Sequence, residues 1–411
     1  MAATCAAILA LAASPALAVQ RYASPGGSGS ACSQSSPCAI QIALNNASTG
    51  DEVIVNPGDY SPPLNLFTPA TNVYVHGADG QPVPRIHFSA GGFLNVENTG
   101  NRASRLTLFG GNSAPLETTS GAEADQIVAV ATAAGQPACY VYATLIDSVC
   151  WSSGASGFGV DAKSSAAFTI TLRNDTLMAT GSGGQAVEID SDTGGTVTAN
   201  LTNVIARGAG GIQFNEASSS SLTGNVDHSN TGSITGTGTG SPAINATNNQ
   251  TTAPLFVNAA AGDFREAAGS PTIDFGVTSP LNGPFDFLGK PRTINGLTDI
   301  GADEFDPFSG VDLSNQSSRV KKRKVRVPIG CPAGTPTSCA GTLALTYGKK
   351  TAGSTSFSIP TGAAKILRVK MSKKALKKLA RRSKLVLQAT ATATDGAGTA
   401  GTATAKVKLK G

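Results

Sequence analysis

The sequence predicts an all-β protein in which a right-handed parallel β-helix of about seven to eight rungs precedes a small basic β-sandwich. A rung is one complete turn of the helix. Residues 157–233 hold two 27-residue repeats and a shorter third one, each containing runs of alternating apolar and polar residues. Alternation of this kind indicates strands, and a short unit that cannot bury its own apolar face is typical of stacked rungs. Right-handedness follows because parallel crossovers are overwhelmingly right-handed.

Charge divides the chain into two parts. Residues 1–310 contain 10 Lys and Arg against 24 Asp and Glu, a balance of −14, whereas residues 311–411 contain 21 against 2, a balance of +19. Such asymmetry predicts two domains with different partners. We expect a β-helix over 19–305, a linker over 306–322 and a basic β-sandwich over 323–411.

The N-terminal segment 1–18 is rich in Ala and Leu and ends in Ala16-Leu17-Ala18. This small-x-small ending is the pattern that a signal peptidase cleaves, so we predict a signal peptide over 1–18. No later stretch is long and apolar enough to span a bilayer. We therefore expect a secreted or cell-surface protein without a transmembrane helix.

Six cysteines follow the predicted signal peptide and fall into three close pairs. An even number of cysteines in a secreted chain indicates disulfides, and the short separations favour bonds within each pair. Zinc is disfavoured because no CxxC spacing or nearby His accompanies a pair. The predicted disulfides are Cys32–Cys38, Cys139–Cys150 and Cys331–Cys339.

A short amphipathic helix is predicted before the first strand of the β-helix. Ile40, Ala43, Leu44 and Ala47 recur at helical spacing, and a strand is expected directly afterwards at 52–56. The end of a β-helix exposes unpaired backbone and core side chains. We expect this helix to act as a cap that prevents edge-to-edge pairing.

Further alternating runs extend the predicted β-helix from this cap to the repeats. Each run ends at polar or glycine-rich residues, which is typical of strands bounded by turns. The expected strands lie at 71–77, 84–90, 92–98, 104–111, 125–132 and 139–151.

Two sets of motifs resemble known families. Pro37-Cys38, Gly50-Asp51 and the turn at 57–60 resemble the start of bacterial extracellular β-helix proteins of the pectin-lyase-like superfold. A second set resembles the closing segment of choice-of-anchor Q surface proteins, and it comprises residues 254–256, 262–265, 269–271 with Asp274 and Gly276, 289–292 and 299–304. The resemblance implies a secreted β-helix whose C-terminal attachment device varies between members. It implies no catalytic residues.

The basic part contains six alternating runs and one predicted helix. The runs at 324–330, 341–348, 354–360, 364–371, 384–395 and 402–410 predict a small antiparallel sandwich. This part resembles Ig-like C-terminal domains appended to secreted actinobacterial proteins. Between the fourth and fifth runs, residues 372–384 predict a short amphipathic helix with Ser372 as its N-cap.

On this helix the apolar face is expected to contain Ala375, Leu376, Leu379 and Ala380, and the remainder is cationic. One interpretation is a solvated face that aids solubility. The other is attachment to anionic envelope polymers such as teichoic acid, acidic polysaccharide or a lipid surface. Nucleic acid is not expected because no aromatic residues are interleaved to stack bases. The candidate binding residues are Lys373, Lys374, Lys377, Lys378, Arg381 and Arg382.

A gapless alignment of the three repeats places Asp161, Glu188 and Asn215 in one column. Carboxylates on neighbouring rungs would lie about 5 Å apart, a spacing that matches the pair in retaining glycosidases. Asp190, Asp192 and Glu216 add acidic groups nearby, so Glu188, Asp190 and Asp192 are candidate calcium ligands. A third interpretation is a polar ladder on the solvent face. No other cofactor is indicated.

Two other polar features are expected to be structural. Asn174 and Asn203 align after a shift of two residues, which keeps both side chains on one face and predicts a stack that satisfies rung backbone. His228 beside Asp227 is the only histidine among the repeats, and we expect a structural or exposed pair rather than a general base.

Two hypotheses for function remain. The sequence lacks the Arg-x-Pro-x-x-Arg of a β-eliminating lyase and the Asn-Thr-Asp, Asp-Asp, Gly-His-Gly and Arg-x-Lys series of a polygalacturonase. We therefore favour a non-catalytic protein that binds extracellular or cell-wall polysaccharide and is held to the envelope by its basic part. The alternative is a polysaccharide lyase or glycosidase with its groove near Asp161, Glu188 and Asp190.

Overall fold

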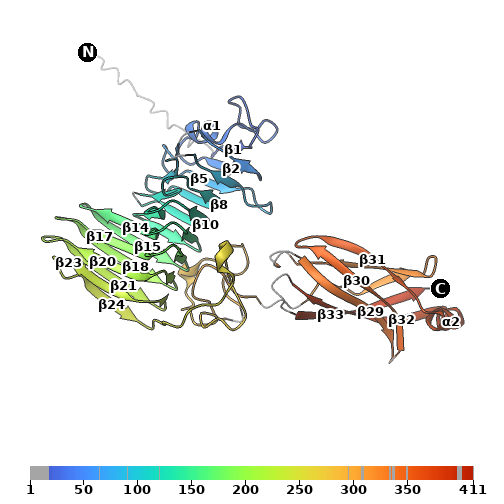
Figure 1. The fold of residues 1–411 in the computed structure, drawn as a ribbon. Coiled ribbons are helices and arrows are strands. Elements are labelled where there is room, and N and C mark those ends of the chain that lie inside the picture. Colours follow the sequence, from blue (N-terminus) through green and yellow to red (C-terminus); the bar gives the residue numbers. More distant parts are fainter. Residues whose placement is uncertain are drawn as a thin grey trace, which may run out of the picture. The chain divides into compact units, whose positions relative to one another are not determined.

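A computed structural model describes residues 18–63, 65–89, 91–119, 121–294, 296–306, 310–332, 335, 338–348, 350–395 and 400–410. The chain divides into two compact units (Figure 1). The first contains the described residues up to Pro254 together with Asp274–Asp303, and the second contains Leu255–Ile273 and Glu304–Gly411. The predicted signal peptide lies outside the described residues apart from Ala18. No helix in the described part of the chain is long and apolar enough to cross a membrane.

The first unit is a parallel β-helix of about seven rungs, which confirms the predicted fold class. In its central part each rung has three strands. One such rung consists of β14 (Phe158–Ser164), β15 (Ala167–Arg173) and β16 (Thr176–Ala179). Each of these strands pairs in parallel with its counterpart on the next rung, β17 (Gln185–Ser191), β18 (Thr196–Thr202) and β19 (Ile205–Arg207).

Parallel strands stack into one sheet of eight and one of sixteen within the described residues. The eight-stranded sheet also contains β4 (Leu66–Phe67), β7 (Leu94–Val96), β9 (Leu116–Thr118), β11 (Pro137–Val141), β20 (Gly210–Glu216) and β23 (Ile234–Gly238). The main path of the sixteen-stranded sheet adds β1 (Gln20–Ala23), β2 (Glu52–Val55), β5 (Tyr74–Gly77), β8 (Arg102–Phe109), β10 (Glu123–Ala131), β12 (Thr144–Ile146), β21 (Ser221–Asp227) and β24 (Ala243–Thr247). Its remaining strands are β3 (Asp59–Tyr60), β6 (Arg85–His87), β13 (Val149–Ser152) and β22 (Asn230–Thr231).

The core of the β-helix is a stack of small and branched apolar side chains. Val160, Val187 and Ile212 are partners on successive strands of the eight-stranded sheet, and all three are completely buried. Because strand residues alternate between faces, the residues that follow each of them point outward. The same alternation therefore builds the core and lines up polar side chains on the outer face.

The number of strands per rung differs from the sequence prediction. The run at 139–151, expected as one strand, forms β11, β12 and β13, and each full repeat forms three strands. Asp147 takes a left-handed conformation with φ of 49° between β12 and β13. Corner residues such as this one bend the chain within an uninterrupted alternating pattern, so the pattern did not reveal them.

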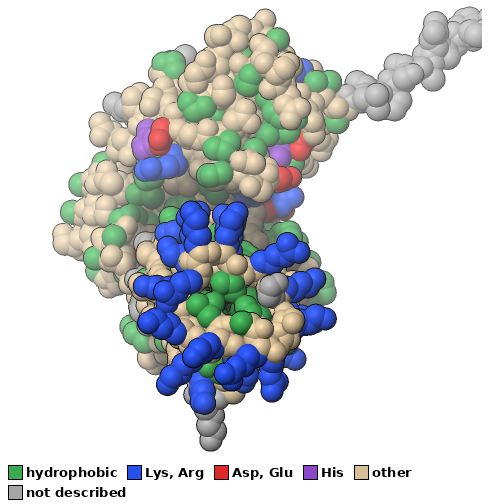
Figure 2. Space-filling view, turned by 90° about the vertical axis from the view of Figure 1, so that its right-hand side faces the viewer, with side chains coloured by type: hydrophobic (Ala, Val, Ile, Leu, Met, Phe, Trp, Pro, Cys, Tyr) green, Lys and Arg blue, Asp and Glu red, His purple; other side chains and the backbone are tan. Residues whose placement is uncertain are grey.

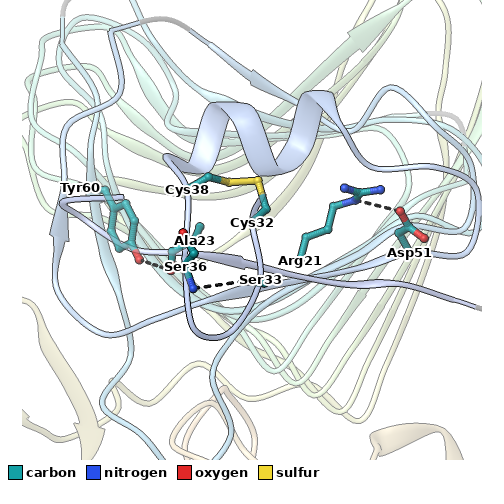
Figure 3. The surroundings of a disulfide bond; sticks show 8 residues. All are labelled: Arg21, Ala23, Cys32, Ser33, Ser36, Cys38, Asp51 and Tyr60. Atoms are coloured by element: carbon teal, nitrogen blue, oxygen red, sulfur yellow. Dashed lines mark hydrogen bonds and ion pairs between the residues drawn. A yellow bond between two sulfur atoms is a disulfide. The ribbon is translucent and has the colours of Figure 1, made fainter. Parts of the chain in front are cut away.

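The N-terminal cap is confirmed. Helix α1 (Ile40–Asn45) buries Ile40, Ala43 and Leu44. The Cys32–Cys38 disulfide closes the loop that precedes this helix (Figure 3). Strand β1, which the sequence did not indicate, pairs in parallel with β2. The Tyr60 hydroxyl donates to the carbonyls of Ala23 and Asn56, so that β1 is joined to the first complete rung.

A lateral segment, Asp274–Asp303, packs along the corners of successive rungs. The amide of Gln126 donates to the carbonyl of Asp286, and the amide of Asn174 donates to the carbonyl of Asn282. Gly301 donates its backbone N–H to the carbonyl of Asn203. Contacts from several rungs thus hold one irregular segment against the β-helix. The segment contains the 3-10 helix η2 (Pro280–Asn282).

The second unit contains a five-stranded sheet and a two-stranded antiparallel pair among its described residues. The five-stranded order is β27 (Gln316–Arg319), β33 (Ala400–Lys410), β32 (Lys384–Thr394), β29 (Ser338–Tyr347) and β30 (Lys350–Pro360). The pair is β28 (Lys324–Gly330) with β31 (Ala364–Lys370), and α2 (Lys373–Arg382) connects β31 to β32. The unit also includes a second antiparallel pair, β25 (Phe256–Asn258) with β26 (Asp263–Glu266), and η1 (Ala259–Ala261) lies between these strands in the chain. Strand β27 lies inside the segment expected to be a linker.

Strand alternation explains how so basic a sequence folds. On β33, Val407 and Leu409 are buried, while Lys406, Lys408 and Lys410 are exposed. Strand β28 alternates in the same way. Each strand therefore contributes apolar side chains to one shared core and cations to the solvent face.

The three predicted disulfides, Cys32–Cys38, Cys139–Cys150 and Cys331–Cys339, are all formed.

Candidate functional site

A polar column runs along the outer face of the eight-stranded sheet. One side chain from each strand except β4 contributes, and strand pairing places these residues opposite one another on neighbouring strands. Parallel strands lie about 4.8 Å apart, so an extended polymer could contact several members at once. In order the column contains Asn95, Glu117, Tyr140, Asp161, Glu188, Gln213 and Thr235.

Asp161 and Glu188 are direct partners on β14 and β17, as the repeat alignment predicted. Burial, with the charges of Glu188 and Asp190, raises the pKa of Asp161 to about 7. The pKa of Glu188 is also raised, by burial and then by Asp190. A carboxyl that retains a proton near neutral pH beside a second carboxyl can donate that proton.

Asn215 is not in the column that the gapless alignment predicted. Glu188 pairs with Gln213, whereas Asn215 pairs with Asp190. The rung from Glu188 to Gln213 is two residues shorter than the rung from Asp161 to Glu188. Because this shift is even, Asn215 stays on the outer face. Its amide nitrogen lies 2.8 Å from Glu188 Oε1 and 2.6 Å from Asp190 Oδ1, so Asn215 joins the two carboxylates.

Lys163 was not singled out by the sequence, yet it lies beside the predicted acidic residues. Its Nζ is 3.7 Å from Asp190 Oδ2 and 3.6 Å from Asp192 Oδ1. Asp190 and Asp192, proposed from sequence as calcium ligands, are therefore paired with a cation. In the described part of the chain, no group of three or more His, Cys, Asp or Glu residues is arranged to hold a metal ion.

Aromatic side chains flank the acidic pair. Tyr140 precedes Asp161 in the column, and the ring of Tyr142 meets that of Phe168 edge to face at 5.6 Å. At the capped end of the same face, Phe67 pairs with Asn95 and lines an open pocket with Gln41 and Asn65. The outer face therefore presents ring surfaces as well as carboxylates.

The predicted basic helix is α2, and its N-cap is confirmed. The backbone N–H of Ala375 donates to Ser372 Oγ at 3.3 Å. Ala375 and Leu379 are buried, and Leu376 packs against the same core. Ala380, predicted on the apolar face, is exposed because its position lies too far around the helix from the centre of the buried stripe.

An open pocket lies between α2 and the β29–β30 hairpin. Lys350 and Tyr347 line it from the hairpin side, and Lys378 Nζ lies 4.7 Å from the centroid of the Tyr347 ring. Lys373, also predicted to bind, is on α2 but does not line the pocket. In Figure 2, Lys and Arg side chains gather around the face of this unit. The helix residues that line the pocket are Lys374, Lys377, Lys378, Arg381 and Arg382.

The remaining polar predictions concern corners of the β-helix. Asn174 and Asn203 are completely buried and left-handed, and Asn203 Nδ2 lies 3.0 Å from Asn174 Oδ1, which confirms the predicted stack. His228 is also left-handed, and its Nδ1 lies 2.9 Å from Asp227 Oδ2. Asp227 additionally accepts from Thr247 and Asn248. This pair serves as a corner connection.

Three residues of the candidate sites were not predicted from the sequence. Tyr140 and Lys163 lie on the outer face of the eight-stranded sheet, and Lys350 lines the pocket beside α2. Tyr140 and Asp161 are closer in the chain than one full repeat, so the repeat alignment did not include Tyr140. Lys163 could have been found from the repeat alignment, since it falls opposite Asp190 at the same spacing as Asp161 and Glu188. Lys350 approaches α2 only through the packing of the folded unit.

Comparison with known proteins assigns this chain to no family. A scan against protein-family models and a search of curated proteins both found no match. Among solved structures, "Crystal structure of pectate lyase Pel9A" is similar with a TM-score of 0.31 and 13% identity, over 70% of this chain and 96% of that chain. The strand pairing, rather than this similarity, establishes the parallel β-helix.

Proposed function

We propose that this protein is secreted or displayed at the cell surface. We further propose that it binds extracellular polysaccharide along the outer face of the eight-stranded sheet and does not cleave it. The observation that carries the proposal is the column that includes Tyr140, Asp161 and Glu188, with one side chain per strand. Carboxylates accept hydrogen bonds from sugar hydroxyls, and tyrosine rings offer an apolar face with a polar end. The three disulfides fit folding in an oxidising compartment.

The chemistry of this face favours certain polymers. Glu117, Asp161, Glu188 and Asp190 lie on β9, β14 and β17 of this sheet, and the pKa values of Glu117, Asp161 and Glu188 are raised by burial and by neighbouring acids. A polymer of uronic acids would add negative charge to this group, which costs free energy. The proposed ligand is therefore an uncharged or amino polysaccharide.

Sedimentation with insoluble polysaccharides tests this proposal. Tyr142→Ala removes a ring beside the column and should weaken retention, whereas Tyr74→Ala, a matched change on the sixteen-stranded sheet, should not. Equal retention of both variants and the unchanged protein would place binding away from this face. Glu188, Asp190 and Asp192 are the candidate calcium ligands, and adding calcium or a chelator to the same assay tests whether binding depends on calcium.

The second unit is proposed to hold the protein to anionic envelope polymers. Support comes from the balance of +19 over residues 311–411 and from the cations of α2, which face solvent while Ala375 and Leu379 are buried. Screening over about 8 Å at physiological salt should make this attachment sensitive to ionic strength. Co-sedimentation of the full chain with isolated cell-wall material at low and high salt is the test.

The alternative function is a carbohydrate-active enzyme, either a polysaccharide lyase or a glycosidase. One observation favours it: the pKa of Asp161, raised to about 7 by burial and by Glu188 and Asp190, suits a proton donor beside a second carboxyl. Assays for reducing ends and for unsaturated products on a polysaccharide panel distinguish the two functions. Turnover that disappears in Glu188→Gln would overturn the non-catalytic proposal.

A further inference from the structure

We propose that the pocket between α2 and the β29–β30 hairpin binds phosphate groups of an anionic envelope polymer, with Lys350 and Lys378 as contacts from its two sides. This inference rests on the attachment role proposed above for the second unit. It adds a defined site, a ligand chemistry and a contribution from the hairpin that the helix sequence alone did not indicate.

The pocket brings cations together from two separate elements. On α2, Lys374, Lys377, Lys378 and Arg381 occupy positions i, i+3, i+4 and i+7, so they share one side of the helix over about 10 Å. Lys350 begins β30 and lines the pocket from the hairpin. A ligand in the pocket can therefore be contacted from the helix and the hairpin at once.

The aromatic ring of Tyr347 fixes one of these cations. Lys378 Nζ lies 4.7 Å from the ring centroid, and Lys378 is half-buried although the other cationic residues of α2 are exposed. A cation over a ring face is attracted by the ring quadrupole, which restricts the positions of the lysine. Lys378 is thus held at the pocket rather than free in solvent.

The residues that line the pocket carry only positive charge. Those that the structure describes include six Lys and Arg side chains and no Asp or Glu. Like charges gathered at close range repel one another, and a bound anion relieves that repulsion. The site therefore selects for a high density of negative charge.

Phosphate suits this arrangement better than carboxylate. The non-bridging oxygens of a tetrahedral phosphate point in different directions, so one group can receive hydrogen bonds from Lys378 and Lys350 together. A carboxylate holds both oxygens in one plane and is matched by a single guanidinium fork. Cations that converge from two elements favour the tetrahedral ion.

A soluble polymer fits the surface better than a membrane. An interfacial helix must release an apolar face into the lipid boundary, whereas Ala375 and Leu379 of α2 are buried in the core of the unit. Nucleic acid would need rings for bases to stack on. Tyr347, the aromatic residue that lines the pocket, is covered by Lys378.

The test uses the full chain and calorimetric titration with a synthetic glycerol-phosphate oligomer. Lys350→Gln combined with Lys378→Gln should weaken binding by about tenfold or more, since two charge-assisted contacts are lost. The matched control is Lys406→Gln with Lys408→Gln, which removes the same charge from exposed positions on β33 that do not line the pocket. Its affinity should change by less than about threefold, because screened charges outside the site contribute little. Unchanged thermal unfolding shows that both variants fold.

Three further probes identify the ligand class: an oligogalacturonate of equal charge, vesicles of phosphatidylglycerol with phosphatidylcholine, and single-stranded DNA. Tighter pocket-dependent binding of any of these than of the glycerol-phosphate oligomer would overturn the phosphate-polymer assignment. If the two double variants weaken binding equally, the pocket is not the site, yet attachment through the basic unit stands. If the unchanged protein binds neither the oligomer nor cell-wall material, both the pocket and the attachment role fail.

Discussion

Arg292 Nη1 lies 3.3 Å from Asp147 Oδ1 in the interior of the first unit, where the two side chains are 1% and 4% exposed. Asp147 occupies a corner of the β-helix, and Arg292 belongs to the lateral segment. Arg292 also donates to the backbone carbonyls of Asp299 and Ala302. Burial raises the pKa of Asp147, and the charge of Arg292 opposes that change. One buried cation thus connects the lateral segment to a rung.

Replacing Arg292 should destabilise the first unit far more than replacing Asp147. Arg292→Met removes one donor from Asp147 and from the carbonyls of Asp299 and Ala302, and we expect these unsatisfied buried acceptors to cost about 3 to 5 kcal/mol in the free energy of unfolding. Asp147→Asn keeps an acceptor in place while Arg292 retains its carbonyl partners, so its cost should be about 1 to 2 kcal/mol. The fluorescence of Trp151, the single tryptophan, follows unfolding of this unit in urea.

Asp79→Asn is the matched control for that comparison. Asp79 pairs with Arg105, but its side chain is 87% exposed, so the change should cost less than about 1 kcal/mol. Equal effects of Arg292→Met and Asp79→Asn would mean that the buried pair does not join the lateral segment to the β-helix.

Asn203 should be sensitive to both its conformation and its hydrogen bonds. With φ of 55°, it donates to Asn174 and to the carbonyl of Val277, and it accepts from the Val277 backbone N–H. We expect Asn203→Ala to cost about 2 to 4 kcal/mol, because alanine loses the hydrogen bonds and resists a left-handed backbone. Asn203→Gly should cost about 1 kcal/mol less, since glycine accepts that conformation.

The control for Asn203 is another asparagine ladder. Asn245 Nδ2 lies 2.8 Å from Asn225 Oδ1, but Asn245 is exposed, so Asn245→Ala should change the free energy of unfolding by less than about 1 kcal/mol. Urea unfolding of the three variants, followed by Trp151 fluorescence, makes the comparison. Equal costs for Asn203→Ala and Asn203→Gly would refute the conformational part of the argument.

Local sequence patterns predicted the parts of the fold that depend on local spacing. Cysteine separation gave the Cys139–Cys150 pair, and the 27-residue repeat gave the Asp161–Glu188 pairing. The register failed one rung later, where Glu188 pairs with Gln213 rather than with Asn215. The rung from Glu188 to Gln213 is two residues shorter than the preceding rung, and the missing residues fall at a glycine-rich corner. The apolar pattern of the strands does not change where a corner is shortened. Register at that point is set by stacking on the neighbouring rung.

The basic pocket shows the same limit. The periodicity of α2 predicted which helix residues are cationic and which are buried, because helix geometry is local. Lys350 and Tyr347 are separated from α2 by the rest of β30 and by β31, and only the packing of the hairpin against the helix brings them to the pocket. No pattern within either segment carries that information.

The Cys139–Cys150 disulfide should stabilise the first unit to a limited extent. It joins β11 to β13 across 11 residues, and a loop this short constrains little of the unfolded chain. We expect replacement of both cysteines by alanine to cost about 2 to 3 kcal/mol. Replacing Cys331 and Cys339, which lie in the second unit, is the control and should leave the Trp151 transition in place.

Thiol titration gives an independent check of the pairing. Unreduced protein produced without residues 1–18 and denatured in urea should contain no free thiol, because its six cysteines are paired. Detection of two or more free thiols would contradict the pairing.

Asp161 should make the stability of the first unit depend on pH between about 4 and 7. Burial, with Glu188 and Asp190, raises its pKa in the folded state to about 7, against about 3.9 for an unfolded chain. In this range the folded protein binds a proton that the unfolded chain has released. The resulting stabilisation is fully present below pH 4 and is lost as the pH rises through 7. Asp161→Asn, which is neutral throughout, should remove this contribution.

Two measurements check that expectation and bear on the alternative catalytic function. The free energy of unfolding of the unchanged protein and of Asp161→Asn is measured by Trp151 fluorescence from pH 4.5 to 8. Relative to the unchanged protein, the variant should become more stable as the pH rises. Carbon-13 NMR should give a titration midpoint for Asp161 near 7, and Glu188→Gln should lower it, because the Glu188 charge helps to raise the pKa. A midpoint near 4 in the unchanged protein would mean that the carboxyl is well solvated. Asp161 would then be ionised at neutral pH, and the glycosidase alternative would lose its proton donor.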